Sequence, residues 1–377
     1  MSSNSIRPYR RCVRCIMDTS DPDIVFDGDG VCNHCHRYER VAAERLVPEA
    51  ERQGRLSALA SQIRSEGKGK PYDCIIGVSG GVDSTYLAYV VKRQLGLRPL
   101  AVHLDNGWDS ELAVSNIEKT LKALEIDLYT YVIDWEEFRD LQIAFLKGST
   151  PDGEVPTDHA ISAVLYERAA HFGVRYILLG TNVVTEAILP VKWGYGYFDF
   201  RYIKDVHRRF GQRPLRTYPH FSLFRLFWYL FRKRIRSVSI LNYIHYDKAA
   251  AMALIQGDLG WKYYGGKHYE SIYTRFYQAY VLPRKFDIDK RKAHYSNLVC
   301  SGQLTREKAL EMLAEPVCPE GMLAEDRDYV IKKLSLTESE FEALLAIPAR
   351  TFLDYRTSYR LFELAKRVVN KGRRLIG

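Results

Sequence analysis

The stretch "CIIGVSGGVDSTYLAYVV" at residues 74–91 changes from a strand pattern to a helix pattern across one short polar break. Residues 74–78 have the length and apolar content of a buried strand. From residue 84 the apolar residues recur at helical spacing, and Gly96 is well placed to end that helix. The break itself, "SGGVDS" at 79–84, contains glycines that allow a tight turn and a close approach of backbone N–H groups to a ligand.

This break, here called the phosphate loop, has the features of a site for phosphate oxygens. The following helix adds its positive N-terminal end, and two serine hydroxyls add donors. The pattern is neither GxxxxGK[ST] nor GxGxxG, so it is neither a Walker A loop nor a dinucleotide fingerprint. The alternative is a Ser/Gly turn without a ligand. The residues expected around the phosphates are Ser79, Gly80, Gly81, Val82, Asp83 and Ser84.

Strand and helix patterns alternate on both sides of this loop as far as Thr185 and then stop. The alternation predicts an α/β fold with a parallel, doubly wound sheet that has helices on both faces. Beyond Thr185 we expect an aromatic, basic insertion and then a mostly helical C-terminal part. Further strands are expected at 99–104, 128–133 and 174–179, and further helices at 114–124 and 161–172. The predicted segments are 1–40 (zinc-binding), 41–189 (sheet domain), 190–246 (insertion) and 247–377 (helical part completing the substrate site).

Two cysteine pairs near the N-terminus indicate a metal site. Cys12 and Cys15 form one CxxC pair, Cys32 and Cys35 form the other, and sixteen residues separate the pairs. Four thiolates at this spacing predict a zinc ribbon with no open coordination position, and hence a structural Zn²⁺. The intervening segment is too polar to build a core, so the metal would supply its folding energy. The alternatives are four free thiols, or ligation by His34 or His36 in place of one cysteine.

The positive charge of the chain is concentrated in one segment. The 377 residues carry a net charge of +9, and residues 201–236 alone contain eleven Lys and Arg against one acid, Asp205. This segment could attract an anionic substrate or a partner subunit, rest on a membrane surface as a peripheral contact, or bind RNA. No apolar run reaches the ~18 residues of a membrane span. With no signal-peptide pattern and few cysteines, a cytoplasmic location is expected.

The phosphate loop resembles the PP-loop of the ATP pyrophosphatases, which include GMP synthetase, NAD synthetase, asparagine synthetase and tRNA thiolases. "VHLDNG" (102–107) and "LLGTNVVTE" (178–186) resemble later strand ends of the same superfamily. The resemblance implies that ATP is split to AMP and pyrophosphate. Ligands of open parallel sheets bind at the carboxyl ends of strands. The further ATP contacts implied are His103, Asp105, Asn106, Gly180, Thr181 and Asn182.

Two acids are candidates for Mg²⁺, a hard cation that prefers carboxylate and phosphate oxygens. They are Asp83 in the phosphate loop and Glu186 after the later strand. The alternatives are a helix N-terminal acid favoured by the helix dipole for Asp83, and a solvated surface acid for Glu186.

From about Cys12 to about Leu313 the chain resembles the N-acetyl sugar amidotransferases of bacterial surface-polysaccharide biosynthesis, including lipopolysaccharide O-antigen, and of flagellin-glycan biosynthesis. The cysteine pairs, the phosphate loop, "KHYES" (267–271) and "KFDIDKRKAH" (285–294) carry this resemblance. It implies that ATP adenylates the acetamido group of a nucleotide-linked N-acetyl sugar, and that ammonia then displaces AMP to leave an acetamidino group. The catalytic candidates are Asp83, Ser84, Lys267, His268 and Glu270. Further cations that could face the phosphates are Arg275, Lys285, Lys290 and Arg291.

The source of ammonia is expected to be a partner. No glutaminase pattern is evident in the chain, and the resemblance implies a separate class I glutaminase subunit, with no nucleic acid involved. The main alternative function is a tRNA thiolase of the same superfamily, although Cys300 and Cys318 are isolated and lack the thiolase pattern. A zinc-dependent nucleic-acid binder is a third hypothesis, and it leaves the phosphate loop unexplained.

Overall fold

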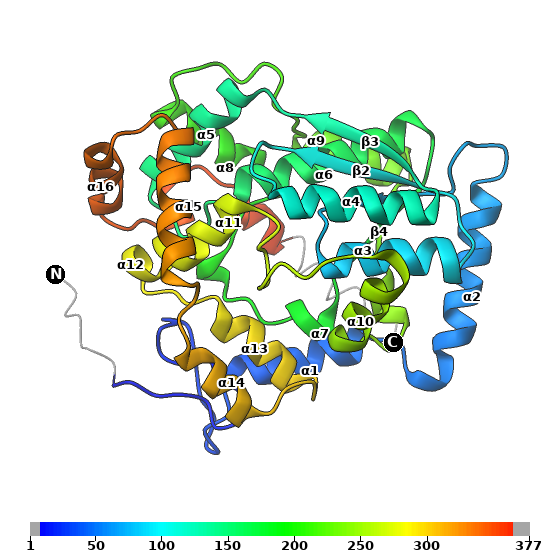
Figure 1. Ribbon diagram of the computed structural model, residues 1–377, viewed down its shortest axis with the longest axis horizontal. Coiled ribbons are helices and arrows are strands. Elements are labelled where there is room, and N and C mark those ends of the chain that lie inside the picture. Colours follow the sequence, from blue (N-terminus) through cyan, green and yellow to red (C-terminus); the bar gives the residue numbers. More distant parts are fainter. Residues whose placement is uncertain (1–7, 365–377) are drawn as a thin grey trace.

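A five-stranded parallel sheet forms the centre of the computed structural model, which describes residues 8–364 (Figure 1). The strand order is β3-β2-β1-β4-β5, and all neighbouring strands run parallel. The strands are β1 (Cys74–Gly77), β2 (Pro99–Asp105), β3 (Asp127–Val132), β4 (Tyr176–Leu179) and β5 (Arg236–Ser239). The predicted α/β class and parallel sheet are confirmed. The chain order reverses between β1 and β4, where such sheets open a crevice for ligands.

The α-helices of the N-terminal half are α1 (Asn33–Arg45), α2 (Glu49–Glu66), α3 (Val82–Tyr89), α4 (Glu111–Leu124), α5 (Trp135–Gly148), α6 (Val155–His171) and α7 (Val183–Glu186). Those that follow are α8 (Phe200–Phe210), α9 (Leu223–Phe227), α10 (Lys248–Leu259), α11 (Ile272–Phe276), α12 (Leu282–Phe286), α13 (Arg291–Cys300), α14 (Arg306–Ala314), α15 (Glu320–Lys333) and α16 (Glu338–Ala346). Short 3-10 or π-helical turns lie at Val191–Trp193, Ile240–Tyr243, Phe352–Asp354, Val90–Gln94, Trp228–Arg232 and Tyr277–Val281.

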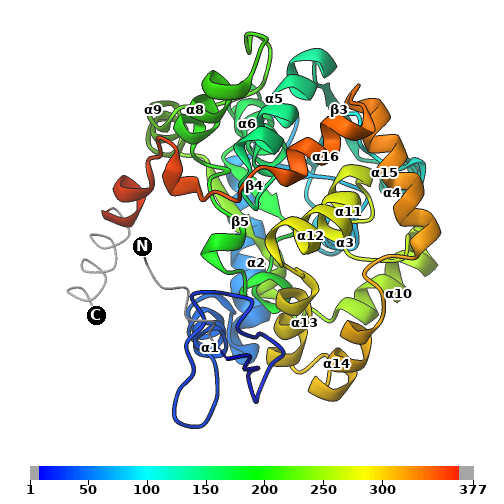
Figure 2. The same ribbon diagram turned by 90° about the vertical axis from the view of Figure 1, so that its left-hand side faces the viewer.

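Two hydrophobic cores cover the two faces of the sheet. In β1, Ile75 points into one core and Ile76 into the other, as the two-residue period of a strand requires. Helices α2, α3, α4 and α10 contribute to one core, and α5, α6 and α8 to the other (Figures 1 and 2). The helix after β1 ends as predicted, with Gly96 at a φ of 60° directly after its last turn.

A strand in the basic segment corrects one prediction. The sequence predicted no sheet element beyond Thr185, but β5 lies at residues 236–239 and pairs with β4, with Tyr176 opposite Arg236. The strand has only four residues, "RSVS", and half of them are exposed. A short edge strand of this composition has no apolar run for a sequence pattern to detect. The 190–246 segment therefore contributes to the sheet as well as to the surface.

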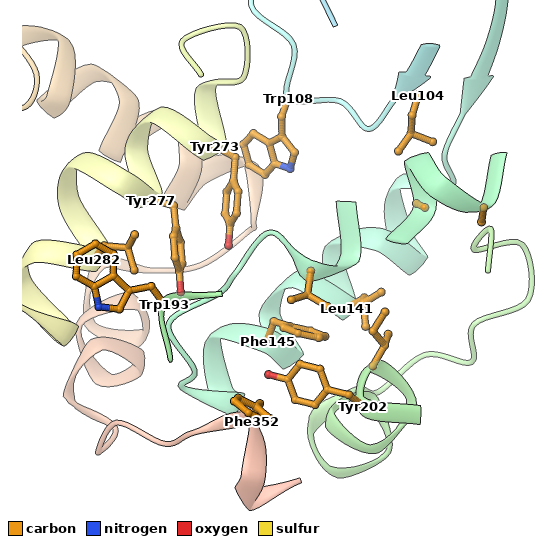
Figure 3. Packing of buried hydrophobic residues seen from close by; sticks show 14 of the residues in the cluster. Leu104, Trp108, Leu141, Phe145, Trp193, Tyr202, Tyr273, Tyr277, Leu282 and Phe352 are labelled. Atoms are coloured by element: carbon orange, nitrogen blue, oxygen red, sulfur yellow. The ribbon is translucent and has the colours of Figure 1, made fainter. Parts of the chain in front are cut away.

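The C-terminal region is mostly helical, as predicted, and it packs against the end of β2. Trp108, just after β2, lies against Tyr273 of α11 with ring centroids 5.1 Å apart, and Tyr273 in turn stacks on Tyr277 (Figure 3). A capping box formed by Thr337 and Glu340 begins α16.

A buried ion pair joins α11 to α15. The Nε and Nη2 atoms of Arg275 donate to the two carboxylate oxygens of Asp326, each at 2.6 Å. Arg275 is therefore paired with Asp326 and does not face the phosphate loop. The sequence analysis had named it as a cation that could face the phosphates. Both side chains are almost fully buried. If one partner were removed, water could not solvate the charge of the other.

Replacing Asp326 with alanine should destabilise the protein by about 3 kcal/mol, because the charge of Arg275 is left buried and unpaired. The measurement is the urea-induced unfolding midpoint. The matched control is Asp328→Ala, since Asp328 lies two residues away with an exposed side chain, and it should shift the midpoint little. Equal effects of the two variants would contradict this role of the pair.

Candidate functional site

A cavity of about 500 Å³, here called the main cavity, opens where β1 and β4 end. It lies between the sheet and the C-terminal region, at the crevice expected from the strand order. The sequence-predicted residues on its wall are Ser79, Gly81, Val82, Asp83, Ser84, Gly180, Thr181, Glu186, Lys267, His268 and Glu270. Three separate stretches of the chain, 79–84, 180–186 and 267–270, are thus brought to one site.

The phosphate loop is held in place by contacts that exclude side chains. Gly80 has a φ of 76°, and a Cβ atom there would lie 2.5 Å from the carbonyl oxygen of Ala113. The carbonyl oxygen of Gly80 accepts a hydrogen bond from the indole Nε1 of Trp261 at 2.8 Å. The hydroxyls of Ser79 and Ser84 lie 3.2 Å apart. The N-terminus of α3 therefore lies at the cavity wall. This is a favourable position for an anion.

The turn after β4 approaches the start of α3 very closely. A Cβ atom at Gly180 would lie 3.0 Å from the backbone of Asp83, so a larger residue would push the turn after β4 away from the start of α3. Thr181 shares the cavity wall, whereas the side chain of Asn182 is buried and caps α7 by accepting from the N–H of Thr185 at 2.9 Å. Asn182 therefore stabilises this turn without lining the cavity.

The two acids predicted for Mg²⁺ both line the main cavity. Asp83 accepts a hydrogen bond from the hydroxyl of Tyr246, and Glu186 lies 3.6 Å from the ammonium of Lys267. Two carboxylates on the wall of one cavity are compatible with a magnesium ion whose remaining ligands come from ATP and water. This assignment stays a prediction.

A lysine that the sequence analysis did not single out joins Lys267 at the main cavity. Lys248 is the first residue of α10, and burial, followed by repulsion from Lys267, lowers its pKa. Its proximity to Lys267 arises from the tertiary fold, since the two residues belong to different segments. Two ammonium groups on one wall are suited to the charge of a polyphosphate.

His268 and Glu270 form a pair on the same wall. Their Nδ1 and Oε1 atoms are 3.6 Å apart, and His268 has a φ of 65°. Burial raises the pKa of Glu270, but the nearby His268, a backbone hydrogen bond and the charge of Lys267 together outweigh burial, so the pKa lies below its usual value. Glu270 is therefore held ionised inside a recess, where it can accept a proton or orient a donor.

Three predicted ATP contacts at the end of β2 do not lie on the wall of the main cavity as the structure describes it. His103 contacts the carbonyl oxygen of Val78 and the carboxylate of Asp109. Asp105 and Asn106 accept hydrogen bonds from backbone N–H groups two residues further on. Their side chains shape the turn after β2.

The remaining predicted cations also lie off this wall. The ammonium of Lys285 donates to three carbonyl oxygens at the end of α16, at 2.6 to 2.9 Å. Arg291 binds the carboxylate of Asp289 and three nearby carbonyl oxygens. Lys290 lies close enough to Asp152 and Glu154 to lower their pKa values by its charge, although burial raises both pKa values overall.

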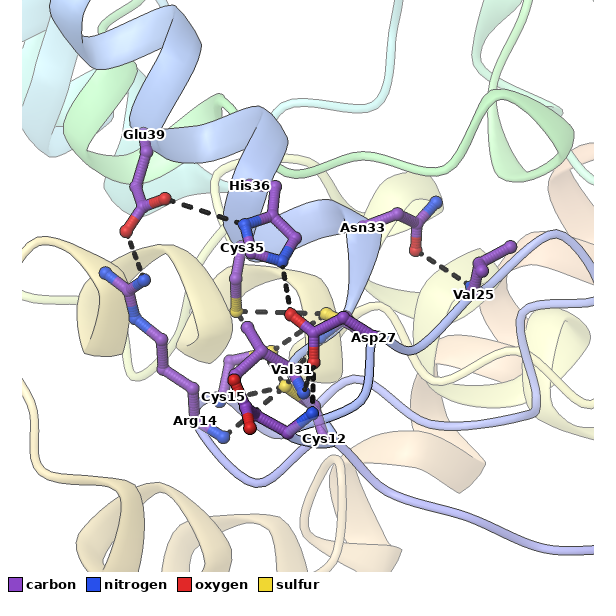
Figure 4. A network of polar contacts seen from close by, with 12 residues as sticks. Cys12, Arg14, Cys15, Val25, Asp27, Val31, Asn33, Cys35, His36 and Glu39 are labelled. Atoms are coloured by element: carbon purple, nitrogen blue, oxygen red, sulfur yellow. Dashed lines mark hydrogen bonds and ion pairs between the residues drawn. The ribbon is translucent and has the colours of Figure 1, made fainter.

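The four N-terminal cysteines form a buried cluster (Figure 4). Their sulfur atoms all lie within 4.8 Å of one another, with Cys12 to Cys35 at 3.8 Å and Cys15 to Cys32 at 3.6 Å. Four sulfurs bound tetrahedrally to zinc at ~2.3 Å would be about 3.8 Å apart. The cluster therefore fits the predicted Zn²⁺.

Neighbouring histidines and a fifth thiol complete the surroundings of this cluster. His34 binds Asp21 at 2.6 Å and His36 binds Asp27 at 2.7 Å, so each ring is oriented toward a carboxylate and the four-cysteine set is preferred. The sulfur of Cys300, at the end of α13, lies 3.8 Å from that of Cys35. The sequence showed Cys300 only as an isolated residue, because this proximity depends on the tertiary fold.

The cysteine segment docks directly on the C-terminal helices. The N–H of Ile16 donates to the hydroxyl of Ser296 in α13 at 3.2 Å, and Lys292 pairs with the buried Asp18 at 2.8 Å. Arg306 of α14 donates to the carbonyl oxygens of Cys12 and Cys15. The cysteine segment thus holds α13 in place, and α13 contributes Leu298 to the wall of the main cavity.

Comparison with known proteins agrees with this architecture. Residues 270–368 match the family described as "LPS biosynthesis protein WbpG-like, C-terminal domain". The C-terminal part of the chain is thus similar to a WbpG-like domain. The matched region begins at Glu270, on the wall of the main cavity, so this region and the phosphate loop meet at one site.

Two curated relatives are similar to part of the chain. The glutamine-hydrolyzing GMP synthase of Pyrobaculum aerophilum is 37% identical over 83 residues, covering 22% of this chain and 16% of that protein. The corresponding enzyme of Aeropyrum pernix is 34% identical over 110 residues, covering 28% of this chain and 20% of that protein. The chain thus spans at most a fifth of the length of these relatives.

A solved structure, the ammonia-dependent NAD synthetase of Campylobacter jejuni in complex with nitrate, is 16% identical. It covers 75% of this chain and 94% of its own, with a TM-score of 0.31. Among residues 8–364, no helix has both the length and the apolar content needed to cross a bilayer.

We predict one tightly bound zinc ion per chain. Elemental analysis of the purified protein should find it, and the Cys12→Ser/Cys32→Ser double variant should lose both the metal and thermal stability, because two ligands and the folding energy of the segment are removed. The matched controls are Cys318→Ser, a buried cysteine elsewhere, and Cys300→Ser, which should keep the zinc. A double variant with unchanged stability would contradict the assignment.

Proposed function

We propose that this protein is an ATP-dependent amidotransferase of lipopolysaccharide biosynthesis. It adenylates the acetamido group of a nucleotide-linked N-acetyl sugar and uses ammonia to form an acetamidino group, with release of pyrophosphate and AMP. The observation that carries the proposal is the shared wall of the main cavity: the phosphate loop faces Lys267, His268 and Glu270 at the start of a WbpG-like domain.

In the first step the acetamido oxygen attacks the α-phosphorus of ATP, and the bond to the pyrophosphate leaving group breaks. The phosphate loop and the N-terminus of α3 hold the leaving phosphates. Lys248 and Lys267 neutralise the charge that develops on them, and Asp83 and Glu186 would hold a magnesium ion that supplies further charge neutralisation. An amide oxygen is a weak nucleophile, so alignment and electrostatic stabilisation must supply the rate.

In the second step ammonia attacks the activated carbon. The nitrogen lone pair forms the new C–N bond, the C–O bond to AMP breaks, and one proton must leave the nitrogen. Glu270, held ionised beside His268, is the group we assign to accept that proton. An adenylated intermediate is also open to hydrolysis, so the site has to exclude water.

Asp83→Asn should abolish AMP formation, because it removes a charge beside the reacting phosphates and alters the first turn of α3. The assay incubates the protein with ATP, ammonium and a panel of acetamido nucleotide sugars, and scores AMP by mass spectrometry. The matched control is Asp105→Asn, which changes an acid off the cavity wall and should keep most of the activity. Ser84→Ala should behave like Asp83→Asn, with the zinc still bound.

The nucleotide product decides the reaction class. Detection of ADP and orthophosphate in place of AMP and pyrophosphate would rule out the proposed chemistry. Equal losses in Asp83→Asn and Asp105→Asn would also count against the main cavity as the ATP site.

Ammonia supply by a separate class I glutaminase completes the proposal. Ammonium at neutral pH is mostly protonated and has no lone pair for attack, so direct delivery near the sugar is favoured. A place for such a partner is the projecting 223–236 segment, where Phe224, Phe227 and Phe231 are 85%, 55% and 73% exposed among basic side chains. Large exposed aromatic side chains that lie together mark interaction surfaces.

The isolated chain should therefore use ammonium at high concentration but not glutamine. Product formation is measured with each nitrogen source at matched total nitrogen. A Phe224→Ser/Phe231→Ser variant should keep the ammonium-dependent rate and lose stimulation by the added glutaminase. Glutamine-dependent turnover by the lone chain would defeat this part of the proposal.

A further inference from the structure

A buried histidine next to the phosphate loop connects this loop to the turn after β2. His103 lies in β2, is 8% exposed, and stands off the wall of the main cavity as the structure describes it. Its Nδ1 atom is 3.0 Å from the carbonyl oxygen of Val78, the residue directly before the phosphate loop. Its Nε2 atom is 3.1 Å from a carboxylate oxygen of Asp109. The ring thus spans the space between the end of β1 and the turn that follows β2.

Both neighbours of this ring accept hydrogen bonds. A carbonyl oxygen and an ionised carboxylate can only accept, so both contacts are hydrogen bonds only when each ring nitrogen carries a proton, as in the imidazolium form. Burial alone would lower the pKa of His103. The hydrogen bond and charge of Asp109 act against burial, together with the hydrogen bond to Val78 and the charge of Asp105, so this pKa lies above its usual value.

The turn that carries Asp109 is bonded to the strap of chain that carries Glu270. Asp109 forms an antiparallel bridge with Ser271, and the N–H of Ser110 donates to the carbonyl oxygen of Glu270 at 2.8 Å. The side chain of Glu270 in turn faces the phosphate loop, since a Cβ atom at Gly81 would lie 3.4 Å from its Oε1 atom. The loop and Glu270 therefore face each other across the main cavity and are also joined behind its wall.

The pair of His103 and Asp109 is largely shielded from water, with side chains 10% and 16% exposed. Charges in such surroundings are screened little by salt and interact strongly. Loss of the second ring proton leaves a nitrogen lone pair facing an oxygen acceptor, so an attractive contact becomes a repulsive one. One contact ends at the phosphate loop and the other at the turn that holds Glu270. The charge of the ring therefore decides how closely these two parts approach.

We propose that His103 is a positioning residue whose positive charge holds the phosphate loop at the distance from Glu270 that ATP binding requires. It acts through Val78 and Asp109 and does not touch ATP. This role rests on the proposed function, in which ATP binds at the phosphate loop. Since the pKa of His103 is raised, the link is complete at low pH and is lost as the pH rises through that pKa, and the affinity for ATP falls with it.

Calorimetric titration with α,β-methylene-ATP, which cannot release pyrophosphate, tests this role. His103→Gln should weaken binding by about tenfold or more, the loss of a hydrogen bond to a charged group, and should abolish the pH dependence. Asp109→Asn should also weaken binding and move the pH dependence to lower pH, because the ring loses its counter-charge. The matched control is His207→Gln. His207 contacts Asp140 at 3.3 Å with similar burial, away from the main cavity, and its replacement should change the affinity little.

Two results of the titration would overturn the proposed role. One is unchanged affinity in both His103→Gln and Asp109→Asn. The other is weak binding in His103→Gln with normal binding in Asp109→Asn, which would indicate that the ring contacts ATP directly.

Nitrogen NMR of the protein with labelled histidine tests the charge of the ring without a ligand. The His103 signals, identified by their loss in His103→Gln, should show two protonated nitrogens and lose the second proton at a higher pH than histidine in a short peptide. Asp109→Asn should lower that pH. A ring that is already neutral where the peptide is protonated would refute the cationic link. If the unaltered protein binds no α,β-methylene-ATP, the proposed function fails, and the NMR measurement still decides whether His103 carries the charge.

Discussion

The close approach of two backbones at Gly180 is the constraint on which the site depends. The end of β4 meets the first turn of α3 with no room for a side chain, and Gly80 makes a similar approach to α4. These contacts fix the phosphate loop between strands at which the chain order reverses. Every other group of the main cavity is positioned relative to that loop, so a shift of a few tenths of an ångström there would change the spacing between the loop and the ammonium groups of Lys248 and Lys267.

The C-terminal domain closes the site from the opposite side and is itself fixed by two different kinds of contact. Aromatic packing of Trp108 on Tyr273 holds α11 to the sheet, and polar contacts with the cysteine segment hold α13. Because Glu270 and Leu298 belong to the same domain, both contacts influence the shape of one cavity. The four-cysteine cluster is thus connected to the cavity wall through α13.

Local motifs account for what the sequence could predict. The phosphate loop, the cysteine pairs and the alternating elements up to β4 are encoded in short stretches, and the structure contains all of them. The edge strand β5, the second lysine at 248 and the proximity of Cys300 to Cys35 depend on segments far apart in the chain. His103, Asp105 and Asn106 lie at the end of β2, and their hydrogen bonds reach Val78, Thr157 and the turn after the strand, contacts that spacing alone cannot reveal; their role toward ATP stays a prediction.

The docking of the N-terminal cysteine segment on α13 has a consequence for how the protein is assembled. Ile16 and Ser296 are separated by 280 positions, so the cysteine segment leaves the ribosome long before the helix that provides its binding surface. Contacts of such long sequence separation form late and slowly. The nascent chain would therefore expose its metal-binding thiols throughout synthesis, and early capture of zinc would protect them from oxidation until the cavity closes.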